Sequence, residues 1–445
     1  MVADMREMKD SGLPWAGEIP INWKIMPIKY LKANVVNAFV DGPFGSNLKS
    51  QHYVDDGDVY VIESGFISTG VFIYKEFKTI TNEHFATINR SECKAGDVII
   101  AKIGANFGMA GELPVLDKPS VVSGNSLKIT LEQQRILNYL FVREMEIAKY
   151  NGGFISIVNE TAQPALSLSS LNNFRLIIPP FEEQLKIEQF LMKKCAEIDA
   201  LSADIQSEIE TLEAYKRSII TEAVTKGLDK NEPMKESGIE WVGRIPTTWT
   251  MVRGKYAFEQ KSDRGNTKSL VLLSPTQNYG VIPQDLYEEL SGFSAVKLNE
   301  KTDYNSLKTV HKGAFVISLR SFQGGFEYSE YEGVVSPAYQ VFYPTIPVCD
   351  GYYKYLFKTQ IFIDKMNSYT MSLRDGKNIA FADFGRTYIP VPPVSEQIKI
   401  AKFLDDKCDV IRDTIAQKQE QLSILADYKK SVIYEYVTGK KEVPA

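Results

Sequence analysis

Apolar residues recur every seven positions in two long segments of the chain. The first segment carries on this grid Leu191, Ile198, Ile205, Leu212 and Ile219, with Leu201, Ile209 and Tyr215 at the intervening three- or four-residue steps. The second segment carries on the same grid Leu404, Ile411, Leu425 and Val432, with Cys408, Ile415 and Leu422 in a companion row. A stripe with this spacing lies along one face of an α-helix and is typical of coiled coils. The pattern therefore predicts two long helices, each with one apolar face.

The ends of both predicted helices are marked in the sequence. Each helix follows a Pro-Pro pair with Glu and Gln close behind, which suits the positive end of a helix dipole. The strings "TKG" at 225–227 and "TGK" at 438–440 supply a glycine for C-terminal capping. Helices of this length would extend roughly 65–70 Å and would expose an apolar stripe if they were isolated. We therefore expect the two helices to pair antiparallel and to bury their stripes against each other.

The same sequence plan occurs twice. Residues 179–225 and 392–438 align without a gap, and 21 of the 47 positions are identical. Upstream, "SGLPWAGEIPINW" at 11–23 matches "SGIEWVGRIPTTW" at 237–249 with 7 identities in 13 positions. Each copy thus consists of a Trp/Pro segment, a long variable region and a long helix. We expect a pseudo-twofold axis to relate the two copies.

The variable regions 24–178 and 250–391 read as mixed α/β. Both are rich in Val, Ile, Phe, Tyr and Gly with short alternations, which favours strands. "GDVIIAKIGANFG" at 96–108 and "GAFVISLRSFQGG" at 313–325 each indicate a Gly turn, an apolar strand and a Gly-bearing loop. The predicted fold class is α+β, with two mixed α/β domains in tandem joined by two long antiparallel helices in a coiled coil. The predicted boundaries are 1–178, 179–227 for the central helix, 228–391, and 392–445 for the C-terminal helix.

Composition and charge narrow the class of protein. The chain is 44% apolar and 24% charged, as is usual for globular proteins. No apolar run approaches the roughly 18 residues of a membrane span, and the start "MVADMREMKD" lacks the apolar core of a signal peptide, so we expect a cytoplasmic protein. The four Cys and three His residues are too scattered to predict a zinc site or a disulfide framework. The net charge of −5 argues weakly against a nucleic-acid partner, although residues 24–178 are neutral overall and residues 250–391 carry +2.

The repeated strings, taken in order, resemble those of the specificity subunits of type I restriction-modification systems. "WAGEIPINW" and "WVGRIPTTW" resemble a motif that opens each half of that family, and "GDVIIAKIGANFG" resembles a strand and loop of its target-recognition domains. "IIPPFEEQLKI" and "PVPPVSEQIKI" resemble its helix starts, and "AYKRSIITEAVTKG" and "DYKKSVIYEYVTGK" its helix ends. The resemblance covers nearly the whole chain. One departure is that Ala314 follows the glycine in the second copy, where Asp97 follows it in the first.

The resemblance implies a non-catalytic, sequence-specific subunit that binds double-stranded DNA. Each target-recognition domain would read one half of a bipartite target, which would be asymmetric because the two domains differ in sequence. The two helices would set the spacer between the half-sites and dock two modification subunits. S-adenosylmethionine for adenine methylation, and ATP with Mg²⁺ for restriction, would belong to the partner modification and restriction subunits. This chain itself would hold no cofactor or metal.

Loops beside the predicted strands carry the candidate DNA-contacting residues. Arg, Lys, Asn and Gln side chains read base edges and hold phosphates. In the first domain the candidates are Asn47, Lys49, Lys102, Asn106 and Gln163. In the second domain they are Arg264, Lys268, Arg320, Gln323, Arg374, Lys377 and Asn378. Any one of them is as readily a solvated surface residue, so the prediction rests on the loops as a set.

Three other functions bear on the same strings. A DNA amino-methyltransferase needs Asp, Asn or Ser before its Pro-Pro-aromatic string, whereas this chain has Ile178 and Val391 there. The triplets "EFK" at 76–78 and "ECK" at 92–94 have the spacing of metal-dependent nuclease sites, but such triplets are expected by chance in a chain with this many charges. A coiled-coil scaffold without DNA specificity stays open on composition alone.

Overall fold

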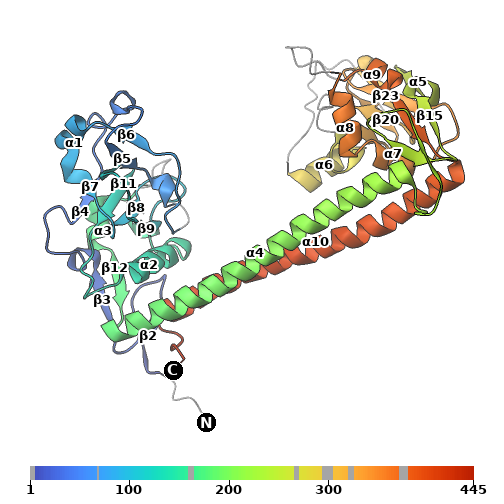
Figure 1. Cartoon of the computed structure of the whole chain (residues 1–445). Helices are drawn as coiled ribbons and strands as arrows, with labels where there is room; N and C mark the ends of the chain where they lie inside the picture. The colour runs from blue at the N-terminus through green and yellow to red at the C-terminus, as the bar shows by residue number, and fades with distance from the viewer. Residues whose placement is uncertain are drawn as a thin grey trace, which may run out of the picture. The chain divides into compact units, whose positions relative to one another are not determined.

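The computed structural model describes residues 6–67, 70–158, 165–264, 270–292, 304–318, 325–369 and 379–444. Its tertiary contacts divide the chain into two compact units. Unit 1 contains Met1–Asp204 and Gln421–Ala445, and unit 2 contains Ile205–Glu420. Each unit holds one sheet-rich domain together with parts of both long helices (Figure 1).

The domain of unit 1 is built on two four-stranded sheets, ordered β6-β5-β10-β7 and β4-β11-β8-β9, with the antiparallel pairs β1-β2 and β3-β12 beside them. The strands are β1 (Met8–Asp10), β2 (Glu18–Pro20), β3 (Lys24–Pro27), β4 (Phe39–Asp41), β5 (Val59–Ile62), β6 (Lys78–Ile80), β7 (Glu92–Cys93), β8 (Val98–Ala101), β9 (Ala110–Glu112), β10 (Ser120–Val122), β11 (Ser126–Ile129) and β12 (Arg175–Ile178). The helices are α1 (Asn82–Ile88), α2 (Asn138–Tyr150) and α3 (Leu168–Asn173), with short 3-10 turns η1 (Ile28–Tyr30), η2 (Ser50–His52), η3 (Ser64–Phe66), η4 (Asn89–Ser91) and η5 (Ile155–Ile157).

Strand β8 shows how the sequence pattern follows from burial. Successive side chains of a strand point to opposite faces of the sheet. Val98 and Ile100 face the main core of unit 1, while Ile99 and Ala101 face a second core that includes Val122. A strand covered on both faces reads as a continuous apolar run rather than as an alternation. This is why the string "VIIA" carries no polar residue.

The domain of unit 2 repeats the central sheet of unit 1, because β16-β23-β20-β21 has the same order and antiparallel pairing as β4-β11-β8-β9. Its strands are β13 (Met234–Glu236), β14 (Arg244–Pro246), β15 (Thr250–Arg253), β16 (Phe258–Lys261), β17 (Leu273–Thr276), β18 (Gly280–Pro283), β19 (Lys308–Val310), β20 (Phe315–Ile317), β21 (Phe326–Tyr328), β22 (Gly333–Val335), β23 (Gln340–Pro344) and β24 (Tyr388–Val391). Its helices are α5 (Gly254–Ala257), α6 (Gln284–Ser291), α7 (Asp350–Leu356), α8 (Gln360–Asn367) and α9 (Phe381–Arg386), with the 3-10 turn η6 (Tyr304–Ser306). The tandem arrangement of two mixed α/β domains is therefore confirmed.

The Trp/Pro segments form equivalent hairpins. In unit 1 the hairpin β1-β2 turns through residues 11–17, and in unit 2 the hairpin β13-β14 turns through residues 237–243. Both turns end on a glycine with positive φ, Gly17 and Gly243, whose backbone N–H groups donate to the carbonyls of Leu13 and Ile239. A side chain would be strained at such a φ, which accounts for glycine in both copies.

The two long helices are α4 (Phe181–Lys226) and α10 (Val394–Val437), and each starts directly after its Pro-Pro pair. In unit 1 the beginning of α4 packs against the end of α10, with Leu191 and Val432 in one core and an ion pair of 2.6 Å between Asp199 and Lys429. In unit 2 the end of α4 packs against the beginning of α10, with Val224 and Leu404 in one core. The pairing within each unit is therefore antiparallel, as the sequence predicts.

The predicted stripe residues of the two helices differ in how much of each residue is exposed to solvent. Those at most 8% exposed are Leu191, Ile198, Ile205, Leu404, Ile411, Ile415 and Val432. Those of intermediate exposure are Leu212, Ile219, Leu422 and Leu425. Leu201 and Tyr215 are 49% and 53% exposed, so the expectation that they fill the intervening steps is wrong. The predicted intervening residue Ile209 is buried, and so is Cys195; these two lie four residues after Ile205 and Leu191.

A buried glutamine explains the repeated Glu-Gln of the helix starts. The side chain of Gln184 accepts a hydrogen bond of 3.0 Å from the backbone N–H of Leu137, which precedes α2, and donates to the carbonyls of Arg135 and Pro179. The side chain of Gln397 accepts a bond of 2.8 Å from the N–H of Cys349, which precedes α7, and donates to the carbonyl of Pro392. The first N–H groups of a helix need such partners. Each long helix thus caps a domain helix and fixes it against its own start.

Candidate nucleic-acid interface

Two loops of unit 1 that carry predicted DNA-contacting residues lie together. The segment after β4 carries Asn47 and Lys49, and the β8-β9 turn carries Lys102 and Asn106. The ammonium of Lys102 lies 3.7 Å from a carboxylate oxygen of Asp41 and 5.1 Å from the ring centre of Phe44. Asn47, Lys49 and Asn106 are exposed, whereas most of the Lys102 side chain is covered. The contact between Lys102 and Phe44 therefore brings the β8-β9 turn beside the segment that carries Asn47 and Lys49.

The backbone at this region is held by close approaches that only glycine permits. A Cβ on Gly42 would lie 1.9 Å from the carbonyl oxygen of Ser123, and one on Gly124 would lie 2.7 Å from the carbonyl oxygen of Pro43. The turn between β10 and β11 is therefore pressed against the segment after β4. The backbone N–H of Lys102 donates to the carbonyl of Asn125 at 2.9 Å. Three loops that are distant in sequence thus share one edge of the domain.

Charged and aromatic groups at this edge suit a phosphate-bearing partner. The buried carboxylate of Asp41 is approached by Lys102 and by the exposed guanidinium of Arg90, at 3.4 Å. One carboxylate thus approaches two cations, so these three groups together carry a charge of +1. Phe44 is 61% exposed, which places an apolar surface beside these cations. Basic and amide groups hold phosphates and read base edges, and an apolar ring can contact a thymine methyl.

A pair of histidines supports the loop that carries Asn47 and Lys49. The rings of His52 and His84 lie 4.1 Å apart. His84 Nε2 lies 2.9 Å from the carbonyl oxygen of Asn47, and His52 Nδ1 accepts the backbone N–H of Lys49 at 3.1 Å. Desolvation, followed by the neighbouring His84 and Lys49, lowers the pKa of His52. The neutral ring is the form that can accept this hydrogen bond.

Sequence reasoning missed several residues of this region. Arg90, Phe44, Asn125 and the histidine pair all lie at it, and none belongs to the predicted set. The two histidines are 32 positions apart in the chain, so no local pattern joins them. Asn125 offered the clearest signal, because it follows Gly124 in the turn "SGN".

In unit 2 the structure describes only one of the predicted DNA-contacting residues, Arg264. Arg264 is exposed, and its backbone forms a bridge with Lys308, whose ammonium donates to the carbonyl of Tyr339. Burial, followed by the charge of Arg264, lowers the pKa of Lys308. The remaining candidates lie outside the described residues: Gln163 of the first domain, and Lys268, Arg320, Gln323, Arg374, Lys377 and Asn378 of the second.

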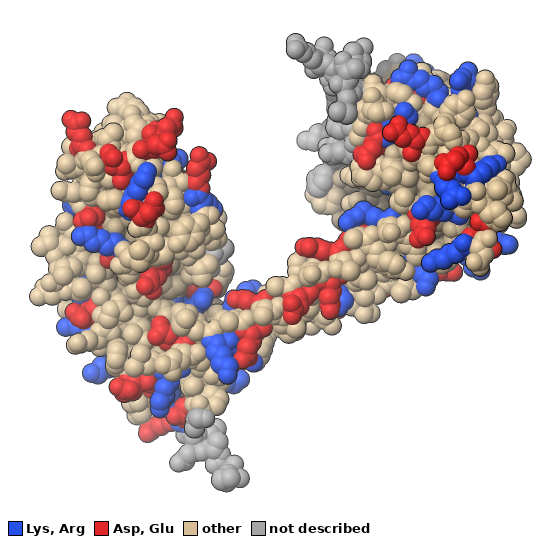
Figure 2. All heavy atoms as spheres, in the orientation of Figure 1, with Lys and Arg blue, Asp and Glu red and all other residues tan. Residues whose placement is uncertain are grey.

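The surface as a whole mixes both signs of charge. Figure 2 shows Lys and Arg interspersed with Asp and Glu on the visible face of each domain and on the helices. Among the described residues, no group of three or more His, Cys, Asp or Glu side chains is placed to hold a metal ion. In the same part of the chain, no helix is long and apolar enough to cross a membrane.

Comparison with known proteins decides the family. The family model for the type I restriction modification DNA specificity domain matches the chain twice, at residues 45–211 and 252–423. The chain belongs to this specificity family. In this specificity protein each match runs from the sheet-rich domain into the following long helix, so the repeat seen in the sequence is a repeat of the family's own domain.

Two proteins of Methanocaldococcus jannaschii are also similar in sequence to the specificity protein. A protein of Methanocaldococcus jannaschii assigned as the type I restriction enzyme MjaX specificity subunit is 21% identical over 442 residues, which covers 96% of this chain and 95% of that one. The type I restriction enzyme MjaVIII specificity subunit of the same organism is 25% identical over 253 residues, or 55% of this chain and 51% of that one.

Solved structures share the fold of the specificity protein. A chain of a type I R-M system, solved in work on complex assembly and conformational transition, has a TM-score of 0.67 at 14% identity and covers 95% of this chain and 99% of its own. The HsdS subunit from Thermoanaerobacter tengcongensis has a TM-score of 0.53 at 13% identity and covers 95% of this chain and 98% of its own. At these identities the likeness concerns the fold.

Proposed function

We propose that the two specificity domains of this chain each read one half of an asymmetric, bipartite DNA target. The observation that carries the proposal is the tandem repeat of one DNA specificity domain on a common sheet order, with different side chains on its loops. The unit 1 edge around Asn47, Lys102 and Arg90 is the surface that we assign to one half-site. Because a common frame with different loops offers different donors and acceptors, the two halves of the target should differ.

The chain itself carries no chemistry in this proposal. The residues before the Pro-Pro pairs, Ile178 and Val391, are the last residues of strands β12 and β24. The pairs themselves precede helix starts, and the carbonyls of Pro179 and Pro392 accept hydrogen bonds from Gln184 and Gln397. This is a structural use of the string, and an apolar side chain could not hold a target amine. Adenine methylation with S-adenosylmethionine and restriction with ATP and Mg²⁺ would belong to partner subunits.

The proposed assembly contains this chain, two modification subunits and the restriction subunits. The helix ends "AYKRSIITEAVTKG" and "DYKKSVIYEYVTGK", which are identical at 7 of 14 positions, support a pair of modification subunits, because a repeated surface can bind the same partner twice. The long helices would set the gap between the half-sites, since helix length is fixed by residue count.

Lys49 and Asn106 provide the test of the DNA-binding surface. Mapping of methylated adenines in cells that contain the chain and its modification subunits should first reveal one bipartite motif with two different halves. Lys49→Ala should then lower the salt dependence of DNA binding by about one phosphate contact, measured by fluorescence anisotropy across a salt series. Asn106→Ala should relax one half-site only, by about 1–3 kcal/mol if it contacts a base.

Lys186→Ala is the matched control, since Lys186 is an exposed lysine of unit 1 on α4, outside these loops. It should bind DNA as the wild type does. If Lys49→Ala and Asn106→Ala both match this control in affinity, salt dependence and half-site preference, the surface is misassigned.

A further inference from the structure

A carboxylate in the first turn of α4 holds an arginine in unit 1. The guanidinium of Arg6 reaches both oxygens of Glu183, with nitrogen–oxygen distances of 2.5 and 2.8 Å. The indole N–H of Trp23 donates to the same carboxylate at 2.9 Å, and the guanidinium carbon lies 5.2 Å from the centre of the indole ring. Both charged side chains are only 21% exposed. Glu183 and Trp23 thus form a site for one guanidinium, which we call the arginine seat of unit 1.

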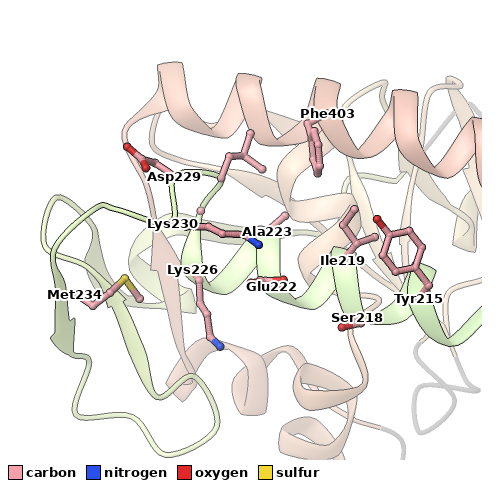
Figure 3. A pocket seen from close by; sticks show the side chains of 12 residues that line it. Tyr215, Ser218, Ile219, Glu222, Ala223, Lys226, Asp229, Lys230, Met234 and Phe403 are labelled. Atoms are coloured by element: carbon pink, nitrogen blue, oxygen red, sulfur yellow. The ribbon is translucent and has the colours of Figure 1, made fainter.

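The internal repeat places the same carboxylate and indole in unit 2. At the offset of 213 the glutamate of the seat corresponds to Glu396, and at the offset of 226 its tryptophan corresponds to Trp249. The arginine, however, corresponds to Glu232. This residue belongs to the segment that leads from the end of α4 to Met234 of β13 (Figure 3). A second carboxylate therefore occurs where the first copy supplies the cation.

The arginine seat of unit 2, which consists of Glu232, Glu396 and Trp249, holds two carboxylates without a paired cation. Among the described residues, neither glutamate forms an ion pair, and the side chain of Glu232 accepts one hydrogen bond, from the hydroxyl of Thr248 at 2.7 Å. Burial raises the pKa of Glu396, the indole of Trp249 lowers it, and the charge of Glu232 raises it again, against a smaller effect of Lys399. Both glutamates are partly exposed, so a cation from outside the chain can reach them.

The indole of Trp249 gives independent evidence of a missing ligand. Trp249 is fully buried, and its indole N–H has no hydrogen-bond partner in the part of the chain that the structure describes. The N–H lies close enough to Glu396 to affect the pKa of this carboxyl group, but the geometry of a hydrogen bond is not reached. A buried donor without an acceptor is costly. In unit 1, where Arg6 is bound, the corresponding hydrogen bond is formed.

The chemistry of the seat favours a guanidinium over other cations. A planar guanidinium matches a carboxylate with two parallel hydrogen bonds and stacks on an aromatic ring, whereas an ammonium group is a compact point charge. The face of an indole ring also attracts a cation placed above it. An indole N–H can only donate, so it cannot serve as a metal ligand. The arginine seat of unit 1 shows the favoured geometry, with Arg6 in place.

The neighbourhood of the seat indicates which partner supplies the arginine. A Cβ atom on Gly227 would lie 2.9 Å from a carboxylate oxygen of Glu396. Gly227 is the last residue of the helix-end string at 214–227, which we assign above to the binding of a modification subunit. The seat therefore continues this proposed surface. The second copy of the string, at 427–440, belongs to unit 1, where Arg6 already occupies the seat.

We propose that Glu232, Glu396 and Trp249 bind one arginine side chain of a modification subunit. Only the modification subunit at unit 2 finds an unfilled seat, so two modification subunits on one chain would be held unequally. The identity of the partner rests on the proposed function, whereas the seat itself rests on the contacts within the two units.

Methylguanidinium, the end group of arginine as a free cation, tests the seat itself. In the full chain, the NMR signal of the Trp249 indole N–H, assigned with Trp249→Phe, should shift on titration with methylguanidinium toward the hydrogen-bonded position of the Trp23 signal. Methylammonium should shift it less. Glu396→Gln should abolish the shift, whereas Glu240→Gln, which alters an exposed glutamate in the β13-β14 turn, should retain it. An unmoved signal in the wild type, or an equal shift in Glu396→Gln, would overturn the proposal.

Glu232→Arg supplies the missing cation within the chain. This variant should show the shifted Trp249 signal without any ligand, and methylguanidinium should move the signal no further. Glu232→Gln removes the like charge without adding a cation, so its signal should stay at the wild-type position until methylguanidinium is added. Thermal unfolding verifies that each variant is folded. A Trp249 signal at the wild-type position in folded Glu232→Arg would show that unit 2 does not form the seat.

Titration with the purified modification subunit tests the partner. Calorimetry of the wild type should resolve two sites of unequal affinity. Glu396→Gln and Glu232→Arg should each weaken the tighter site by about tenfold and leave the other unchanged, while Glu240→Gln should leave both unchanged. Two equal sites in the wild type, or wild-type affinities in both seat variants, would refute docking at the seat. Absence of any binding to the wild type would instead contradict the proposed assembly and the partner named here, whereas the methylguanidinium titration judges the seat alone.

Discussion

A buried ion pair in the first domain is replaced by two apolar residues in the second. Asp97 follows Gly96 and holds the ammonium of Lys128 at 3.3 Å, and both side chains are almost fully covered. At the matching places of the second domain, Ala314 follows Gly313 and Val341 pairs with β20 as Lys128 pairs with β8. Both are fully buried. Ala314 therefore replaces Asp97 together with a second replacement, Val341 for Lys128. The second domain loses both charges of the pair, so neither is buried without its partner.

The exchange predicts how single and double variants of the first domain will behave. Asp97→Ala alone should cost about 3–5 kcal/mol, because it leaves the Lys128 ammonium buried without its counter-charge. Adding Lys128→Val should recover most of this loss, since a well-packed apolar pair can replace a buried ion pair at little cost. Urea unfolding of wild type, both single variants and the double variant measures the coupling. If the double variant is less stable than Asp97→Ala, an apolar pair cannot replace the ion pair at this position of the first domain.

A second residue-scale difference concerns a buried glutamate. Glu144 on α2 accepts the backbone N–H of Ile177 in β12 at 2.7 Å, and burial raises the pKa of its carboxyl group well above the usual value. The residue that matches Ile177 is Pro390, which has no N–H to donate. In the second domain the carbonyl of Pro390 instead accepts the hydroxyl of Tyr353 at 3.2 Å. The polar group that each domain buries follows from the backbone group that it must satisfy.

The raised pKa of Glu144 predicts the sign of a pH dependence. When a carboxyl group binds its proton more tightly in the folded state, the free energy of unfolding of the protein falls as the pH rises above the unfolded pKa of about 4.3. Glu144→Gln keeps the acceptor for Ile177 and removes this titration. The free energy of unfolding of the variant minus that of the wild type should therefore increase between pH 5 and pH 8. Taking this difference cancels Glu327, for which burial raises the pKa to about 7. A constant difference over this range contradicts the argument.

Individual contact residues were the part of the site that the sequence revealed least. Asn47 and Lys102 stood out because polar residues beside glycine indicate a loop next to a strand. Their proximity depends on the close approach of Gly42 to Ser123, which is a tertiary contact without a local pattern. Arg90 lies at this surface because it pairs with Asp41, which is almost 50 residues away along the chain. Such groups become visible only when the sheet register is known.

At the scale of elements, the long helices were the most predictable part. Their starts at Phe181 and Val394 follow from the Pro-Pro pairs, and the end of α4 at Lys226 precedes Gly227, which has a positive φ of 77°. The short strands were less predictable, because those buried on both faces lose the alternation that identifies a strand. The contribution of Gln184 was also hidden, since a helix-start glutamine normally suggests a local cap rather than a cap on another helix.

Gln184 and Gln397 offer a matched pair for testing this inter-helix cap. Gln184→Ala removes three hydrogen bonds and Gln397→Ala removes two, and each leaves buried or partly buried backbone groups without these partners. At about 1 kcal/mol or more for each bond, the losses should be several kcal/mol, with the larger loss for Gln184→Ala. Thermal and urea unfolding measure the change. Gln189→Ala, on an exposed position of the same helix, should be nearly neutral, and a comparable loss there would rule out the capping explanation.

At the scale of the whole molecule, the repeat itself was readable from the sequence because both copies keep their helix strings. The helices are proposed to set the gap between the half-sites, and a deletion of one heptad from each can test this. Asp199 faces Lys429 within unit 1, and Glu208 faces Lys418 within unit 2, so the deletion takes one heptad beside these pairs from each helix, residues 202–208 of α4 and 419–425 of α10. Removing both segments preserves the apolar stripe and shortens each helix by about 10 Å.

The preferred gap between the half-sites should then shrink by about 3 base pairs, at about 3.4 Å per base pair, while the half-sites stay the same. Mapping of methylated adenines in cells that also contain the modification subunits reads out both quantities. An unchanged gap, or altered half-sites, would show that the helices do not act as spacers.

Unit 1 combines two segments that are far apart in the chain, and this affects the order in which the protein folds during synthesis. Its core contains Val432, Ile433 and Val437 of α10, and the hydroxyl of Tyr434 donates to the carbonyl of Ala16. Domains fold as the chain leaves the ribosome, N-terminal parts first. Unit 2 lies within Ile205–Glu420, so all of its residues are available before those that complete unit 1. During synthesis, the domain of unit 1 is therefore translated first but completed last. Until the end of α10 is made, the apolar face of α4 in unit 1 is exposed and can bind the end of α10 from another nascent chain.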